Sequence, residues 1–508
     1  MILRLVALTD VPPGLHGDEA VTAQEAQRLL DEGPIGVWSP SIHGQPAGPF
    51  YWIAAWFLVL PETHFTVRLT TALLGILAVP VFYLFCREMF GRNTALAGAV
   101  ALVFSYWAIN FSRIAFPLAS VPVVECAALY FLAVGVRLGS RWRMGIGGAL
   151  AGATVYTYGS APLFILALVV PAALLLWQHR RPAPVLRRTA THVAIAGIAA
   201  VVAASPFAAF ALGNWDVFTG ASNLLLITET EEFREQSLVS QAGTLLGRGG
   251  YALGIHFHSW HRDAVDAMGL RGLLDPLSAA GFAAGVAVAL WKVRDWRYAL
   301  LISGLLAGTV PAMFTSSSHL DGEVWGEFRR NIISLPFVMA LAGVGGAWAL
   351  SLPNYRDSAW GRAAKLAGWA VVATAVATIA VVNVHHYFFE WAEDDHTRWV
   401  FAQELVLAAE HVNELDAERP TVYLYSVRWG YWYSTADFLF GDLPGVDRSE
   451  EFGNFSLERL HDGDVVYVLM HKYLEHGPEL MERYPGGTYI TERDPEGELI
   501  LAIYYLPG

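Results

Sequence analysis

The sequence predicts a mainly α-helical, polytopic membrane protein with about ten spans, followed by a small C-terminal α/β domain. Of its 508 residues, 55% are hydrophobic and only 16% are charged, whereas a soluble domain is nearer one quarter charged. Uncharged runs recur through roughly the first 390 residues, at about the 20-residue length that crosses a bilayer core as a helix. Charged residues return beyond that point, together with short β-branched and aromatic runs typical of strands.

Ten spans are predicted, and every second loop between them is basic. The spans are 67–86, 94–113, 119–137, 144–158, 161–177, 192–212, 273–291, 298–314, 331–351 and 365–385, and the basic loops lie near 87–93, 137–143, 178–188, 292–297 and 352–365. Because arginine- and lysine-rich loops stay on the cytoplasmic side, the alternation places these loops inside and the others outside. Pro162 predicts a sharp break between the fourth and fifth spans.

The predicted organisation has three parts. Residues 1–66 form an extracytoplasmic loop with interfacial helices, 67–389 a transmembrane domain with a long outer loop at 213–272, and 390–508 an extracytoplasmic α/β domain. In the first part we expect a helix at 18–32 and an aromatic interfacial helix at 50–60, for which a short buried span is the alternative. In the last part we expect helices at 396–416 and 473–483 and strands at 421–425, 464–470, 488–493 and 499–506. The net charge of −13 provides no basic footprint for nucleic acid.

Two adjacent carboxylates, Asp18 and Glu19, open the first predicted helix directly after Pro12-Pro13-Gly14. One interpretation is capping, because acidic residues in a first turn interact favourably with the helix dipole. The other is chemical: a carboxylate at the outer membrane surface could act as a general base or hold a metal.

Arginines at the outer ends of spans form a second group of candidates, namely Arg113, Arg329 and Arg330. The planar guanidinium binds phosphate oxygens in pairs, and a lipid phosphate lies at this depth. Contact with anionic lipids in general is the alternative. Glu125 lies inside a predicted span, where we expect it to pair with Arg113.

The outer loops also contain weaker candidates. A divalent metal could bind His256, His258 and His261, although solvated loop polarity explains the same residues. Trp260 could stack on a sugar ring, and His43 and His319 are further candidates for contact with a substrate. The expected cofactor is therefore none, or a divalent metal ion.

In its order of motifs the chain resembles the C superfamily of membrane glycosyltransferases, the GT-C type, and within it family 39. That family includes the protein O-mannosyltransferases and the lipid A aminoarabinose transferase. Residues 12–20 resemble the family's Asp-Glu motif in the first outer loop, and 45–52 resemble its Pro-Pro-Leu-Tyr-Tyr-Trp segment, with Ala47-Gly48 interrupting the usual Pro-Pro. Arg68-Leu69 with 90–92, then 110–113, and 328–337 resemble later family positions.

The resemblance implies an enzyme that moves a sugar from a polyprenyl-phosphate donor to a glycan, lipid or protein outside the cytoplasmic membrane, with inversion at the anomeric carbon. It implies that Asp18 is the catalytic base, that Glu19 assists by positioning the acceptor, and that Arg113 with Arg329 or Arg330 holds the donor phosphate. Family members have a span before the Asp-Glu loop, and we expect that Met1-Ile2-Leu3-Arg4-Leu5 is the outer stub of this span. The alternative from another functional class is a transporter or flippase, which predicts polar residues at the middle of several spans and internal repeats.

Overall fold

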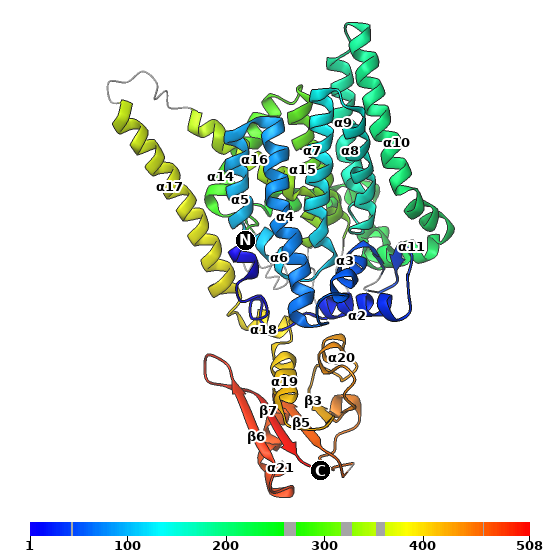
Figure 1. Ribbon diagram of the computed structural model, residues 1–508, viewed down its shortest axis with the longest axis vertical. Coiled ribbons are helices and arrows are strands. Elements are labelled where there is room, and N and C mark those ends of the chain that lie inside the picture. Colours follow the sequence, from blue (N-terminus) through cyan, green and yellow to red (C-terminus); the bar gives the residue numbers. More distant parts are fainter. Residues whose placement is uncertain (42–43, 259–270, 316–327, 352–360, 461) are drawn as a thin grey trace.

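A computed structural model describes residues 1–41, 44–258, 271–315, 328–351, 361–460 and 462–508. A bundle of long helices forms one part of the molecule, and a five-stranded sheet with its own helices lies at one end of this bundle (Figure 1).

A helix occupies each of the ten predicted spans. The helices are α4 (His64–Phe90), α5 (Arg92–Phe104) continued by α6 (Tyr106–Arg113), α7 (Val121–Leu138) preceded by η1 (Pro117–Ser120), α8 (Arg141–Ala153) followed by η2 (Thr154–Tyr156), α9 (Leu163–Gln178), α10 (Ala183–Gly213), α14 (Pro276–Trp291), α15 (Trp296–Phe314), α16 (Leu335–Ser351) preceded by η4 (Phe328–Ser334), and α17 (Gly361–His385) continued by the π-helix η5 (His386–Trp391). Within the described ranges, six helices are long and apolar enough to cross a membrane, and a seventh span results if α5 and α6, bent by 57°, count as one. The helices α9 and α14 have 16 residues each and α8 has 13. The chain is therefore a multi-pass membrane protein, and ten crossings stay a prediction.

The helices pack closely where small residues face a neighbouring backbone. On α8, a Cβ at Gly148 or Gly152 would collide with the carbonyl oxygens of Ala196 and Ala200 on α10. Such contacts are the usual basis of helix association in a membrane, where no hydrophobic effect drives the helices together. The break predicted near Pro162 is present, because α8 ends at Ala153 and α9 begins at Leu163.

Short elements of the N-terminal segment cover the end of the bundle that faces the sheet (Figure 1). They are α1 (Ile2–Leu5), α2 (Gly17–Asp31), the small hairpin of β1 (Trp38–Ser39) and β2 (Gln45–Pro46), and α3 (Gly48–Phe57). With ten residues, α3 is too short to span a bilayer, and it packs Phe50 and Ile53 against Ala23 and Ala26 of α2. The long loop after α10 forms α11 (Trp215–Leu225), η3 (Ile227–Glu229), α12 (Glu231–Arg234) and α13 (Leu238–Gly254).

The C-terminal sheet has the strand order β4-β3-β5-β7-β6. The elements of this part are α18 (Asp395–Val400), α19 (Gln403–Glu414), β3 (Thr421–Tyr425), α20 (Ser434–Phe440), β4 (Gly445–Asp447), η6 (Glu450–Phe452), β5 (Val465–Met470), η7 (His471–His476), α21 (Gly477–Arg483), β6 (Thr488–Arg493) and β7 (Leu499–Leu506). β3 is parallel to both β4 and β5, whereas the pairs β5–β7 and β7–β6 are antiparallel.

Alternation along β3 gives the sheet two buried faces. Val422 and Leu424 pack with Leu405 of α19, while Tyr423 and Tyr425 pack on the other face. The four predicted strands are confirmed, but β4 was not predicted, because three residues are too short to show alternation. The predicted helix 396–416 is wrong in one respect: it is divided into α18 and α19 at Ala402, whose φ is 50°.

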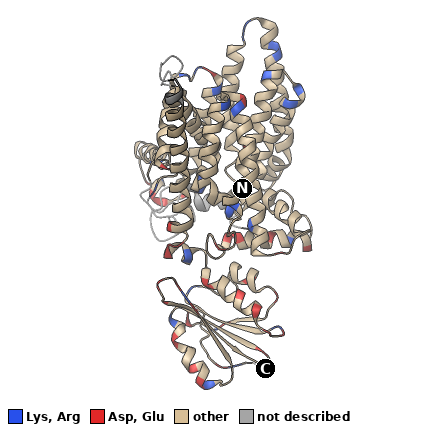
Figure 2. Ribbon diagram, turned by 60° about the vertical axis from the view of Figure 1, so that its left-hand side comes forward, with Lys and Arg blue, Asp and Glu red and all other residues tan. Residues whose placement is uncertain are grey.

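Charge is distributed unevenly along the long axis of the molecule. Most lysine and arginine residues of the helical bundle lie at the end far from the sheet, while acidic residues gather near the sheet and on it (Figure 2). This is the distribution that the alternating basic loops predict.

Candidate active site

Asp18 and Glu19 lie in the first turn of α2, which His16 caps. The His16 Nδ1 accepts the backbone N–H of Asp18 at 3.0 Å, and the His16 backbone N–H donates to the Glu19 Oε2 at 3.1 Å. Together these bonds form a capping box. An Nδ1 that accepts a hydrogen bond carries no proton, so the proton of the neutral ring is on Nε2.

Glu19 is completely buried and is bound to Arg68 of α4. The Arg68 Nε donates to the Glu19 Oε1 and its Nη2 to Oε2, both at 2.9 Å, while the Ala115 backbone N–H also donates to Oε1 at 2.9 Å. With the capping bond from His16, the carboxylate accepts four hydrogen bonds, so no part of it is open to a substrate. The capping interpretation is therefore confirmed for Glu19.

Arg68 also holds the loop that precedes α2. Its guanidinium donates to the carbonyl oxygens of Leu8 at 3.2 Å, Pro12 at 2.8 Å and Gly14 at 2.8 Å, and it has no exposed surface. The sequence motifs included Arg68 but indicated no partner for it. The available signal was an arginine placed inside the outer end of an apolar run, where a charge requires a partner.

Asp18 has the opposite environment. Its side chain is 34% exposed, and its Oδ2 lies 3.8 Å from the Arg329 Nη1 and 4.0 Å from the His16 Nδ1. The fold thus brings together two of the predicted site residues, Asp18 and Arg329, from distant parts of the chain. The Arg329 side chain is only 20% exposed, but its distance of 3.8 Å from Asp18 is longer than a hydrogen bond, so a competing anion can displace Asp18 from Arg329.

Arg330 follows Arg329 in the 3₁₀-helix η4 and is directed to a different partner. Its Nη1 donates to the Tyr158 hydroxyl at 2.8 Å. In a 3₁₀-helix successive side chains diverge by about 120°, which explains why the two arginines have different partners. Tyr158, in the break between α8 and α9, was not among the candidates.

Arg113 is completely buried and is bound to the N-terminal segment. Its guanidinium donates to the carbonyl oxygens of Leu3, Ala7 and Val11 at 2.6–3.0 Å and lies 5.0 Å from the ring centre of Phe388. Its predicted part in donor binding stays a prediction. Glu125 does not pair with Arg113 as expected, and neither of its oxygens has a hydrogen-bond partner in the described part of the chain.

The C-terminal part packs directly against α2. The Thr435 hydroxyl donates to the Leu15 carbonyl at 3.1 Å, and the Gln24 side chain donates to Asp437 at 2.6 Å. A Cβ at Gly17 would lie 2.6 Å from the Tyr433 hydroxyl. Burial raises the pKa of Tyr433, Arg428 opposes this rise, and the Asp18 carboxylate adds to it. Tyr433 is therefore a neighbour of the exposed carboxylate that the sequence did not indicate.

The predicted metal and substrate residues are only partly described. His256 is buried and stacked on Phe282, with its Nδ1 3.0 Å from the Leu253 carbonyl, and burial lowers its pKa to about 4. His258 is exposed and its backbone forms a bridge with Arg271. The remaining candidates, His43, Trp260, His261 and His319, lie outside the described residues. Among the residues that are described, no group of three or more His, Cys, Asp or Glu could hold a metal ion.

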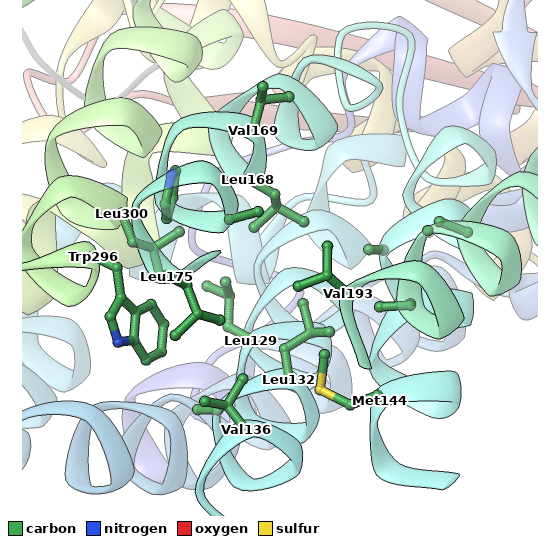
Figure 3. Close-up of a pocket in the computed structure, with 18 of the residues that line it drawn as sticks. Leu129, Leu132, Val136, Met144, Leu168, Val169, Leu175, Val193, Trp296 and Leu300 are labelled. Carbon is green, nitrogen blue, oxygen red and sulfur yellow. The ribbon is translucent and has the colours of Figure 1, made fainter. Parts of the chain in front are cut away.

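A large apolar cavity lies away from Asp18. It has a volume of about 260 Å³ and an almost entirely apolar lining, which includes Leu129, Leu168, Leu175, Val193 and Trp296 (Figure 3). Several of its lining residues come from the ends of α7, α9 and α15 that adjoin the basic loops. A cavity without polar groups offers no acid, base or cation, so the chemical candidates remain those around Asp18.

One family model matches part of this chain, and solved structures have a similar fold. Residues 45–210 match the family model of dolichyl-phosphate-mannose-protein mannosyltransferase. No curated protein sequence matches the chain. Its fold is similar to that of ArnT from Cupriavidus metallidurans bound to undecaprenyl phosphate, with a TM-score of 0.52, 15% identity and coverage of 99% of this chain and 96% of that one. The apo state of the same protein gives a TM-score of 0.54.

A second similar structure is an oligosaccharyltransferase from Archaeoglobus fulgidus, tethered with an acceptor peptide. It has a TM-score of 0.51 and 13% identity, and the match covers 98% of this chain and 72% of that one. Together, the family match and the shared fold confirm the resemblance to the C superfamily of membrane glycosyltransferases.

Proposed function

We propose that this chain is an inverting membrane glycosyltransferase that moves a sugar from a polyprenyl-phosphate donor to an acceptor outside the cytoplasmic membrane. The observation that supports it most directly is the partly exposed Asp18 carboxylate, 3.8 Å from the Arg329 guanidinium, at the end of the bundle that faces the sheet. The family match over 45–210 and the fold shared with ArnT, whose structure contains undecaprenyl phosphate, agree with such a donor.

In this proposal Asp18 is the general base. The acceptor hydroxyl transfers its proton to the Asp18 carboxylate while its oxygen attacks the anomeric carbon from the face opposite the phosphate. The bond from the anomeric carbon to the phosphate oxygen breaks, and its electron pair leaves with the polyprenyl phosphate. Inversion follows because attack and departure occur on opposite faces of the sugar.

Arg329 and Arg330 bind the donor phosphate in the same scheme. Negative charge grows on the leaving phosphate, so cations already in place stabilise the transition state more than the ground state. Arg329 and Asp18 lie 3.8 Å apart, beyond hydrogen-bond distance, so they pair only weakly. A bound phosphate would therefore draw Arg329 away from Asp18 and leave the carboxylate free to accept a proton.

Glu19 positions Asp18 and does not contact the acceptor. Its four hydrogen bonds fix the first turn of α2 relative to α4, which sets the direction of the Asp18 side chain. Arg113 positions Asp18 indirectly, because it holds the loop that precedes α2. We further propose that residues 1–66, 213–272 and 390–508 are extracytoplasmic, with the basic loops inside.

The Asp18→Asn variant tests the catalytic assignment, with Asp31→Asn at the other end of α2 as the matched control. Protein in lipid nanodiscs would be given synthetic polyprenyl-phosphate sugars, and release of polyprenyl phosphate measured with an acceptor mixture. We expect a loss of about 10²–10⁴-fold in Asp18→Asn, the usual contribution of a general base, with unchanged thermal stability. Asp31→Asn, whose side chain is exposed, should keep wild-type activity. Full activity in Asp18→Asn would overturn the assignment.

A further inference from the structure

The C-terminal sheet changes direction at β3. From β3 the chain passes to β4 on one side and then to β5 on the other, and all three strands are parallel. The carboxyl ends of β3 and β5 are thus the point where the two connections diverge. In open α/β sheets, ligands bind outside the carboxyl ends of the strands at this switch point.

Polar side chains converge at these two strand ends. The Ser426 hydroxyl lies 3.4 Å from the His471 Nδ1, and it accepts the backbone N–H groups of Arg428 at 3.1 Å and Trp429 at 2.9 Å. His471 has a φ of 57°, in the left-handed region that a histidine rarely adopts. Such conformations gather at binding sites, where the surrounding structure maintains them.

Arg428 is a rigidly held cation at this point. The Cζ of its guanidinium lies 3.1 Å from the ring centre of Trp399 and 3.8 Å from that of Trp429, and its Nη1 donates to the Trp399 carbonyl at 2.5 Å. The acidic groups whose charges act on its pKa are Tyr433 and Glu404, and both raise it. Burial lowers this pKa to about 10, so the guanidinium remains charged at neutral pH.

The same loop leads from this cation to Asp18. Five residues after Arg428, the Tyr433 hydroxyl lies against Gly17, beside the exposed carboxylate. Five extended residues span at most about 18 Å, which is the length of a few sugar rings. Trp432 lies between Arg428 and Tyr433 in the sequence and is 70% exposed, and an exposed aromatic ring can pack against a sugar.

We propose that residues 426–433, together with His471, bind the acceptor, and that this acceptor is a carbohydrate with a phosphate or carboxylate group. The anionic group contacts Arg428, a sugar ring stacks on Trp432, and the chain of sugars continues toward Asp18. A planar, preorganised guanidinium suits either anion. The inference rests on the proposed transferase function and adds the chemical class of the acceptor.

Binding of three small probes to the full-length chain tests this site independently of activity. Glucose 6-phosphate, glucuronate and glucose would be titrated against the protein in phosphatidylcholine nanodiscs, with saturation-transfer NMR as the readout. We expect glucose 6-phosphate or glucuronate to bind at least tenfold more tightly than glucose, and the tighter of the two identifies the anion. Arg428→Gln should remove this preference, and Trp432→Ala should abolish saturation transfer to the ring protons.

Matched controls exist at the opposite end of the bundle. Arg180 lies 4.3 Å over the ring of Trp177, and Trp291 is 80% exposed. Arg180→Gln and Trp291→Ala should bind the probes as the wild type does. Asp18→Asn should also bind them normally while it fails to transfer sugar, which separates failure of this inference from failure of the proposed function. Equal affinity for glucose and both anions, or unchanged binding by Arg428→Gln and Trp432→Ala, would overturn the proposal. If Arg428→Gln does not fold, the surface variant Trp432→Ala decides.

Discussion

Replacement of Glu19 by glutamine should loosen the N-terminal segment. In the wild type each carboxylate oxygen accepts two hydrogen bonds: Oε1 from Arg68 and Ala115, and Oε2 from Arg68 and His16. A glutamine amide keeps one oxygen, so whichever position receives the NH₂ group faces two N–H donors. Two hydrogen bonds are lost, and Arg68 keeps a buried charge without a counter-ion.

The expected cost follows from that uncompensated charge. Removal of one partner of a buried ion pair destabilises a protein by about 3–5 kcal/mol. Because about 1.4 kcal/mol corresponds to a factor of ten in an equilibrium constant, the loop 8–16 should open about 10² to 4 × 10³ times more often. Arg68→Met should cost at least as much, since the carbonyl oxygens of Leu8, Pro12 and Gly14 also lose their donor.

Hydrogen exchange of the loop residues 8–16 in nanodiscs is the direct measurement, and a double-mutant cycle is the control. The loss of stability in the double variant Glu19→Gln with Arg68→Met should be smaller than the sum of the losses in the two single variants. The reason is that the double variant contains no unpaired buried charge at either position. Glu32→Gln, at the exposed end of α2, provides a matched neutral substitution. Wild-type exchange rates in Glu19→Gln would refute the reasoning.

Three further predictions concern Arg329, the buried His256 and the orientation of the chain in the membrane. Arg329→Gln should lower kcat by about 10²–10³-fold with little loss of thermal stability, because a preorganised charge beside the leaving group is removed; an unchanged kcat in the nanodisc assay would contradict this. The pKa of His256 is lowered to about 4 in the folded chain, so the unfolded state takes up the proton first. Stability should therefore be constant above about pH 6.5 and fall by on the order of 3 kcal/mol as the pH decreases to about 4, a slope that His256→Phe should reduce in thermal unfolding. A reporter fused after Tyr387 should be extracytoplasmic, and a cytoplasmic signal would reverse the proposed orientation.

Much of the fold could be predicted because it depends on local patterns. Apolar runs located a helix in each of the ten predicted ranges, short β-branched and aromatic runs located four of the five C-terminal strands, and Pro162 located the break before α9. The length of an apolar run does not by itself decide whether its helix crosses the bilayer. The helix α8, in one of the predicted spans, has only 13 residues. The sequence pattern did not reveal β4, because three residues are too short to be recognised as a strand. Only its pairing with β3 identifies it.

Side-chain partnerships across the bundle could not be predicted in the same way. The sequence expectation paired Glu125 with Arg113, but the guanidinium of Arg113 is directed to the backbone of the N-terminal segment. Which of several cations meets a carboxylate depends on the directions of helices far apart in the chain. A linear motif contains no information on those directions.

The sequence by itself determined that this is a multi-pass membrane protein and that two adjacent carboxylates begin a helix, because hydropathy and helix capping are properties of neighbouring residues. Only the tertiary structure decided that these carboxylates differ. Glu19 is buried against Arg68, while Asp18 is exposed beside Arg329 and Tyr433. The physical reason is the helical turn: consecutive residues on α2 point about 100° apart, so the two side chains meet different neighbours.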